Sequence, residues 1–337
     1  MTANSKSEIT HPVDVVIPWV DGGDPQLAGK RKAYLPANGN NPNPGAHPTR
    51  FASVNEIRYC VLSILKFAPF VRNIFIVTDG QVPKLYDDIK TWFPERLDSI
   101  RIVDHTEIFE GFEQYLPTFN SISIGNMVWQ IKGLSENFVY FNDDLFLIRP
   151  ITPDQWFVGN RPVMRGRWVP APLPKIWWYK GLTTLNRRLL GKTGYQPRSS
   201  FHLGQWNAAS LLGFKYRYFA ASHTPHAVNR KLYEDFFQNN ISLFEKNISY
   251  RFRNPSQFTF VALSNHLQLL DGNRHTAPPG LAYMQPYKRP PDYIDKKISL
   301  CEKNPDIRYM CAQSLEMCPR EVQQRLFGWL DQLLGIH

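Results

Sequence analysis

Four short apolar runs, each followed at once by acidic or amide side chains, constrain the fold of this 337-residue chain more than any other feature. Each run has the length and composition of a buried strand, and stretches with helical spacing separate them. The runs are DVVIPWV (14–20) before Asp21 and Asp24, NIFIVT (73–78) before Asp79, IRIV (100–103) before Asp104, and NFVYF (137–141) before Asn142, Asp143 and Asp144. Strands that alternate with helices predict an α/β, Rossmann-like fold with a largely parallel central sheet flanked by helices.

Helices are expected between the strands and throughout the second half of the chain. Ser53 and Glu56 form a capping-box pattern, which predicts a helix from Ser53 to Ala68. Apolar spacing predicts further helices over residues 120–131, 201–212, 228–237, 256–270 and 322–334. The last is amphipathic, so it packs on the core, lies on a membrane or forms a dimer contact.

We expect a single domain over residues 13–337, with residues 1–12 as a flexible tail and 38–48 as a loop. The chain has no apolar run of the roughly 20 residues that a membrane span needs, and its first residues do not resemble a secretory signal. A cytoplasmic location is therefore expected. The spacing of the four cysteines does not match a zinc site and favours reduced thiols.

The positive charge is concentrated in one segment. The formal net charge is +10, and Arg161 to Ser200 contains nine Lys or Arg residues and no Asp or Glu, interleaved with Trp and Tyr. We interpret residues 161–200 as a basic insertion of helix and loop. Such a segment attracts polyanions or an anionic membrane surface, so peripheral contact with an anionic membrane is predicted. A solvated loop with aromatic anchors is the structural alternative. No nucleic-acid motif accompanies the segment, so nucleic acid is not an expected partner.

Asn142-Asp143-Asp144 is the strongest chemical signal. Adjacent carboxylates at a strand end need a counter-charge, and Mg²⁺ bound through one or two carboxylates plus substrate phosphates supplies one. A capped turn with solvated carboxylates is the alternative. No GxGxxG or GxxxxGK[ST] loop is present, which argues against a dinucleotide-dependent dehydrogenase or a P-loop kinase.

Histidines and arginines in the second half complete the set that phosphoryl transfer needs. His223 and His226 are candidate proton acceptors, although surface His pairs are common. Arg251 and Arg253 alternate on an apparently extended stretch, which would place both on one face to grip phosphate. Metal ligands, a base and phosphate contacts together favour phosphoryl transfer.

Several motifs resemble the Stealth family, which includes bacterial capsule polymerases and the animal enzyme that makes the mannose-6-phosphate lysosomal tag. The first block of that family resembles DVVIPWVDGGDP (14–25). The second resembles NEIRY (55–59), APFVR (68–72), IFIVTDGQVP (74–83), His105, LPTFNS (116–121) and FVYFNDDL (138–145). The third resembles HTPHAVNRK (223–231) and continues to Arg253, and a weaker fourth lies near 299–306.

The resemblance implies transfer of a hexose-1-phosphate, such as N-acetylglucosamine-1-phosphate, from a UDP-sugar to a sugar hydroxyl, with Mg²⁺ or Mn²⁺ and release of UMP. An oligosaccharide or capsule polymer would be the acceptor, and the basic segment would contact the inner membrane or capsule assembly proteins. By motif, Asp143 and Asp144 would bind the metal, and His223, Asp144, Arg253 and His226 would be catalytic. The implied substrate-binding residues are Asp21, Asp24, Arg58, Asp79, Asn142, Arg230 and Arg251. Residues 254–257 (NPSQ) lack an acidic residue that many members carry soon after the position of Arg253.

Two other functions remain open from the sequence. A metal-dependent glycosyltransferase would share the acidic strand ends but release UDP. A non-enzymatic polyanion-binding protein built around residues 161–200 would not need the Asn-Asp-Asp cluster and would bind with strong salt dependence.

Overall fold

The computed structural model describes residues 10–35, 53–189, 191, 199–287, 289–290 and 292–336. The loop predicted at 38–48 and residues 1–9 of the predicted tail lie outside the described residues. So do residues 190 and 192–198 of the basic segment.

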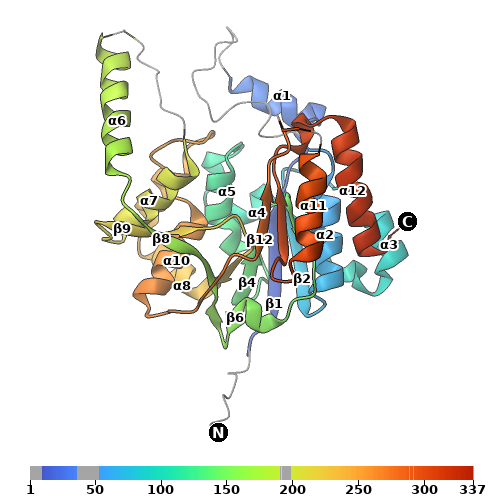
Figure 1. Cartoon of the computed structure of the whole chain (residues 1–337). Helices are drawn as coiled ribbons and strands as arrows, with labels where there is room; N and C mark the ends of the chain where they lie inside the picture. Colours follow the sequence, from blue (N-terminus) through green and yellow to red (C-terminus); the bar gives the residue numbers. More distant parts are fainter. Residues whose placement is uncertain are drawn as a thin grey trace.

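Five strands form the central sheet in the order β10-β4-β1-β2-β3 (Figure 1). They are β1 (Val13–Pro18), β2 (Val71–Thr78), β3 (Ile100–Asp104), β4 (Asn137–Tyr140) and β10 (His226–Asn229). The four strands predicted from the sequence are mutually parallel, and β10 is antiparallel to β4. The predicted α/β fold with a largely parallel sheet is therefore confirmed.

Alternate side chains of β1 enter two hydrophobic cores, one on each face of the sheet. Val15 and Ile17 pack in the first core, which α2, α11 and α12 cover. Val16 packs in the second, under α5, α8 and α10. Fully buried positions on both faces explain why the strands read as continuous apolar runs. The helices are α1 (Pro25–Ala33), α2 (Glu56–Phe67), α3 (Tyr86–Trp92), α4 (His105–Ile108), α5 (Ser121–Met127), α7 (Phe201–Leu211), α8 (Arg230–Gln238), α9 (Ile241–Ile248), α10 (Phe260–Leu270), α11 (Tyr293–Lys303) and α12 (Arg320–Leu334).

Smaller sheets extend the molecule on both sides of the central sheet. One has the order β12-β13-β5, another β11-β8-β9, and β6 pairs with β7. Their strands are β5 (Leu145–Leu147), β6 (Phe157–Val158), β7 (Arg161–Pro162), β8 (Met164–Pro170), β9 (Arg217–Ala221), β11 (Thr276–Ala277), β12 (Leu281–Met284) and β13 (Tyr309–Ala312). Because β5 follows β4 after four residues, the turn between them joins two sheets.

Three boundary predictions were wrong. The helix predicted from Val228 starts at Arg230, because residues 226–229 pair with β4 and the Asn229 side chain caps the helix at Leu232 N. The helix predicted from Ser53 begins at Glu56, although Ser53 Oγ does donate to the Glu56 carboxylate. The helix predicted from Ser256 begins at Phe260.

The basic segment contains both paired strand and projecting helix. Residues 164–170 form β8, which pairs with β9. Residues after 172 form α6 (Leu173–Thr184), which continues as a π-helix over Leu185–Leu189.

The C-terminal helix α12 buries Leu326, Leu330 and Leu334 in the first core. Of the three roles predicted for this helix, packing on the core is therefore the one that the structure shows. Across the described residues, no helix combines the length and apolar character needed to cross a bilayer. All four cysteines are buried free thiols.

Candidate active site

The carboxyl ends of the four parallel strands meet at one edge of the central sheet. Asp79 follows β2, Asp104 ends β3, and Asp143 and Asp144 follow β4. Parallel pairing therefore gathers the acidic strand ends that the sequence predicted, at the edge where α/β proteins bind ligands.

The turn between β4 and β5 holds Asp143 and Asp144 in place. Asn142 O accepts from Leu145 N at 3.2 Å and from Cys60 Sγ at 3.6 Å, which closes the turn. The Asp144 backbone carbonyl accepts from Ala312 N at 3.0 Å, and Cys311 Sγ lies 3.7 Å from Asp144 Oδ2. Oδ1 of Asp144 is buried and has no hydrogen-bond partner among the described residues. An unsatisfied buried carboxylate oxygen is costly and is a natural ligand for a cation.

Two further acids surround the pair. Burial, with the nearby charge of Glu56, raises the pKa of Asp144 to about 6, and Glu316 adds to this effect. Burial and then the Asp144 and Glu56 charges raise the pKa of Asp143 well above its ordinary value. Glu56 is buried and accepts from Val54 N at 2.8 Å and from Ser53 Oγ at 2.9 Å. We call Glu56, Asp143, Asp144 and Glu316 the acidic cluster.

The acidic cluster has oxygen donors but is not a complete metal cage. Within the described ranges, no three His, Cys, Asp or Glu side chains are placed to hold a metal ion together. Mg²⁺ is usually bound by one or two carboxylates with substrate phosphates and water completing the shell. The unpartnered Asp144 oxygen and the mutual repulsion of the carboxyls fit that kind of site.

His226 lies on β10 directly opposite Tyr140, at the end of β4 that leads to the acidic cluster. Burial, with the charges of His223 and Arg165, lowers the pKa of His226 to about 3. His226 is therefore neutral at working pH.

His223 is half-buried and held by two aromatic rings. It stacks on Phe201 with ring centroids 4.5 Å apart and lies 5.6 Å from the Tyr283 ring. Burial raises the pKa of Tyr283, and the charges of Cys311 and Asp144 contribute, so Tyr283 lies near Asp144 as well as near His223. Burial and the nearby His202 lower the pKa of His223, which leaves its ring neutral near pH 7.

Arg253 reaches the same region from the other side. Its Nη2 donates to Ser121 Oγ at the start of α5. Burial raises the pKa of Tyr140, with Arg253 acting against this shift and Asp143 adding to it. Both charges therefore lie near the Tyr140 ring, at the end of β4.

Several predicted substrate-binding residues have other partners. Arg58 binds Asp88 at 2.6 Å and Asp331 at 3.3 Å, on the side of α2 that faces α3 and α12. Arg251 donates to Pro117 O and lies over the Tyr34 ring, 4.4 Å from its centroid. Residues 249–254 form no strand and the chain bends at 251 and 252, so the expectation that Arg251 and Arg253 share the face of an extended stretch was wrong.

Arg230 lies at the opposite end of the sheet. It pairs with Glu136 at 3.2 Å, just before the first residue of β4. The antiparallel course of β10 carries the chain from His226, near the acidic cluster, down to this end. The structure therefore does not bring Arg230 together with the other candidates.

Three predicted acids after β1 and β2 lie at the correct edge but make local contacts. Asp24 Oδ1 caps α1 by accepting from Gln26 N and Leu27 N. Asp21 Oδ1 accepts from Gly23 N, and Asp79 pairs with Lys30 at 3.1 Å.

Sequence reasoning missed several residues around the site. Glu56 was predicted only as a helix cap, and nothing in the sequence joined Tyr283, Cys311 or Glu316 to the acidic residues. Their contacts span the chain, for example 167 residues between Cys311 and Asp144. The pairing of β13 with β5 brings Cys311 to this turn, and the pairing of β12 with β13 places Tyr283 beside Cys311.

Comparison with known proteins identifies the family. Residues 11–39 match Stealth protein conserved region 1, and residues 50–164 match conserved region 2. The chain belongs to the Stealth protein family.

An exopolysaccharide phosphotransferase of Streptomyces coelicolor, SCO6023, is 33% identical over 77% of this chain and 40% of its own length. The capsular polysaccharide phosphotransferase cps1A of Actinobacillus pleuropneumoniae is 40% identical over 44% of this chain and 39% of its own length. The chain thus spans less than half the length of these Stealth relatives.

Among solved structures, the galactosyltransferase LgtC aligns over 96% of this chain and 95% of its own, with 10% identity and a TM-score of 0.44. The two matched Stealth regions contain Asp21, Asp24, Glu56, Asp143 and Asp144. The third and fourth blocks predicted for His223–Arg253 and for residues 299–306 stay predictions.

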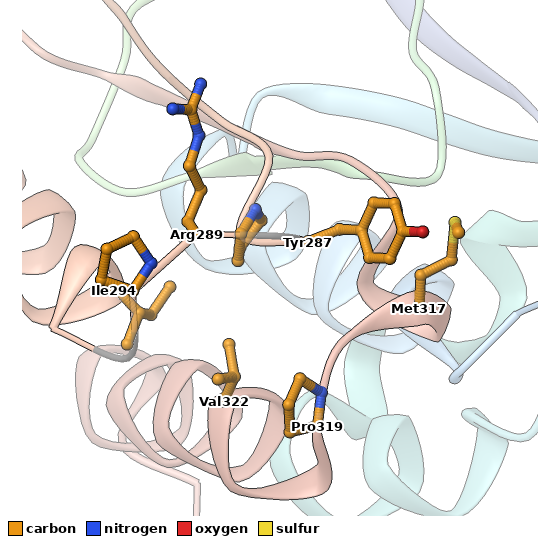
Figure 2. Close-up of a pocket in the computed structure, with 8 residues that line it drawn as sticks. Tyr287, Arg289, Ile294, Met317, Pro319 and Val322 are labelled. Carbon is orange, nitrogen blue, oxygen red and sulfur yellow. The ribbon is translucent and has the colours of Figure 1, made fainter.

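A pocket opens between the residues before α11 and the start of α12 in this Stealth chain (Figure 2). Its volume is about 290 Å³, and Met317, next to Glu316, forms part of its wall. Tyr287 and Met317 lie at one end and Arg289 at the other. The rest of the lining is Pro286, Pro290, Ile294, Pro319 and Val322. The pocket is therefore lined mainly by apolar side chains, with Arg289 as its one cation among the lining residues.

Proposed function

We propose that this protein transfers a sugar-1-phosphate from a UDP-sugar to a sugar hydroxyl, with release of UMP, during capsular or exopolysaccharide synthesis. N-acetylglucosamine-1-phosphate or a similar hexose-1-phosphate is the proposed group. Stealth relatives that are named as polysaccharide phosphotransferases support this reaction. The observation that carries the proposal is the half-buried Asp143–Asp144 pair, which lies inside conserved region 2 and leaves one buried carboxylate oxygen of Asp144 unpartnered. A cytoplasmic location stays a prediction.

Asp143 and Asp144 would hold Mg²⁺ or Mn²⁺ at this edge. When bound, a divalent cation neutralises the two carboxylates and the donor diphosphate together. Arg253 is the proposed phosphate contact, because its guanidinium is oriented by Ser121 and, like the Asp143 carboxylate, lies near Tyr140. Glu56 and Glu316 keep the electrostatic potential of the acidic cluster negative, which favours a cation there.

His223 is the proposed general base. Its neutral ring accepts the proton as the acceptor O–H bond breaks, and the freed oxygen forms a bond to the phosphorus attached to the sugar. The bond from that phosphorus to the UMP oxygen breaks, and UMP leaves with the electron pair. No bond to the anomeric carbon breaks, so its configuration is retained. Phe201 and Tyr283 restrain the His223 ring, and His226 is the alternative base.

Nucleotide release tests the proposal. The protein is incubated with Mg²⁺, a panel of UDP-sugars and short oligosaccharide acceptors, and the nucleotides are separated by chromatography. Acceptor-dependent UMP is the expected product. UDP would instead indicate a metal-dependent glycosyltransferase. No nucleotide release from any donor, with equal UDP affinity in the wild type and Asp144→Asn, would leave a polyanion-binding role and overturn the proposal.

A further inference from the structure

Helix α6 and its π-helical continuation, residues 173–189, stand away from the rest of the molecule (Figure 1). We call this segment the basic arm. Only its lower part is anchored, where Ile176 and Tyr179 pack against a small core that includes Trp206 and Tyr218. In Figure 1 the arm rises on the same side as α1, the helix that follows the carboxyl end of β1.

The basic arm exposes an unusual amount of apolar surface. Trp177 is 70% exposed and Trp178 is 66% exposed, and both are flanked along the helix by exposed leucines at 173 and 185. Tyr216 is 84% exposed near the base, where its carbonyl accepts from Ala171 N at 2.8 Å. Clustered exposed apolar side chains of this size mark an interaction surface.

The same surface is positively charged. Lys175, Lys180 and Arg188 are exposed on the basic arm, and the segment from 161 to 200 has no acidic residue. Lys215 and Arg217 add charge beside the base, with Arg217 lying 4.8 Å from the centre of the Trp168 ring. The charge therefore selects an anionic partner.

We propose that the basic arm binds the surface of an anionic lipid bilayer, with Trp177 and Trp178 at the level of the headgroups. Tryptophan and basic side chains are the residues that anchor proteins at this interface. The exposed leucines favour lipid over a sugar-phosphate polymer, because such a polymer has no hydrocarbon region to receive them. Each basic residue near an anionic surface contributes roughly 1 kcal/mol, so contact through a few such residues is reversible. This proposal does not depend on the transferase activity.

The test is co-sedimentation of the full chain with vesicles of phosphatidylcholine alone or with 30% phosphatidylglycerol, at ~0.1 M salt. We expect binding only to the anionic vesicles. Trp177→Ala/Trp178→Ala and Lys175→Glu/Lys180→Glu should each weaken binding at least ~10-fold. Lys84→Glu/Lys246→Glu, which changes the net charge equally at exposed sites outside the basic arm, should bind nearly as well as the wild type. The melting temperature of each variant verifies that it is folded.

Two results would overturn the proposal. One is equal vesicle binding by the wild type and both arm variants. The other is arm-dependent binding to a soluble anionic polysaccharide, dextran sulfate, without binding to the anionic vesicles, which would assign the basic arm to a polymer. Quenching by bromine-labelled lipid chains supplies a second readout, and we expect the Trp177→Ala/Trp178→Ala variant to lose most of it.

Discussion

The acidic cluster and the basic arm each contain several charges of one sign, but the acidic cluster withdraws its charges from water and the basic arm leaves them solvated. Glu56 is buried and the Asp143–Asp144 turn is half-buried, so burial and the neighbouring carboxyls raise the pKa values of Asp143 and Asp144, and one oxygen of Asp144 lacks a partner. The lysines of the basic arm are solvated, and their repulsion is weakened by water and salt. Like charges that are withdrawn from water require a bound cation or protons, whereas like charges in water attract a distant partner at little cost to stability.

The largest effect is expected from removing one charge of the acidic cluster. Asp144→Asn should lower the rate of acceptor-dependent UMP release about 1,000-fold or more, because one of two proposed ligands is lost. Chromatographic rates at saturating Mg²⁺ measure this loss. Asp98→Asn, at an exposed acid away from the site, serves as the control and should keep the full rate. A fully active Asp144→Asn protein would remove Asp144 from the chemistry.

The next effect concerns the base that acts beside this cluster. His223→Ala should lower the rate about 10²- to 10⁴-fold, the usual contribution of general base catalysis. His275→Ala changes an exposed histidine and should leave the rate unchanged. If His223→Ala keeps the wild-type rate while a folded His226→Ala protein loses it, the base is His226.

The third prediction concerns pH and stability. The pKa of Asp144 is about 6 in the folded protein against an ordinary 3.8, so the folded state binds more protons between these values. The resulting stability is complete below about pH 4 and is lost as pH rises through 6. At pH 7 without metal, Asp144→Asn should therefore melt on the order of 2–4 °C above the wild type, and this difference should shrink toward pH 4.

Adding Mg²⁺ sharpens the same measurement. A ligand that binds only the folded state raises the melting temperature, so the wild type should gain stability at pH 7 and Asp144→Asn should gain much less. Equal melting curves for both proteins at pH 4 and pH 7 would contradict the burial of this charge.

The fourth prediction tests whether the ion pairs of Arg58 stabilise the fold rather than bind substrate. Arg58 was a sequence candidate for substrate binding, but it links α2 to Asp88 and Asp331. Arg58→Ala should lower the melting temperature by a few degrees, since breaking a partly buried pair costs about 1–3 kcal/mol. The KM for the UDP-sugar should not change. A raised KM with an unchanged melting temperature would return Arg58 to the substrate.

The smallest effect is expected on the basic arm. Trp177→Ala should shift the melting temperature by less than about 1 °C, because a side chain that is mostly in water contributes little to folding. Trp206→Ala, a buried aromatic at the base of the arm, is the contrasting variant and should destabilise the protein by about 3 kcal/mol or more. A large loss from Trp177→Ala would mean that the free protein covers this ring.

The sequence predicted the half of the molecule in which local patterns decide structure. Strands β1 to β4 are buried on both faces, so each reads as an apolar run, and their parallel order places the following acids together. β10 was not predicted because its four residues have no strand pattern of their own and pair with β4 only in the folded chain. Arg230 was misplaced for the same reason, since the direction of β10 carries it away from the site.

Only part of the candidate site could be predicted from the sequence. Asp143, Asp144, His223 and Arg253 could be selected because their residue types suit the chemistry. Glu56, Tyr283 and Glu316 could not be, because their proximity to these residues depends on strand pairings between distant parts of the chain.

The pairing of β13 with β5 has a consequence for when the site comes into being during synthesis. A ribosome has made residues 143 and 144 long before it makes residue 311, which lies beside Asp144 in the finished protein. The nascent chain therefore lacks the contacts that Cys311 and Ala312 make with Asp144, and the turn after β4 gains them only when β13 has been synthesised and pairs with β5.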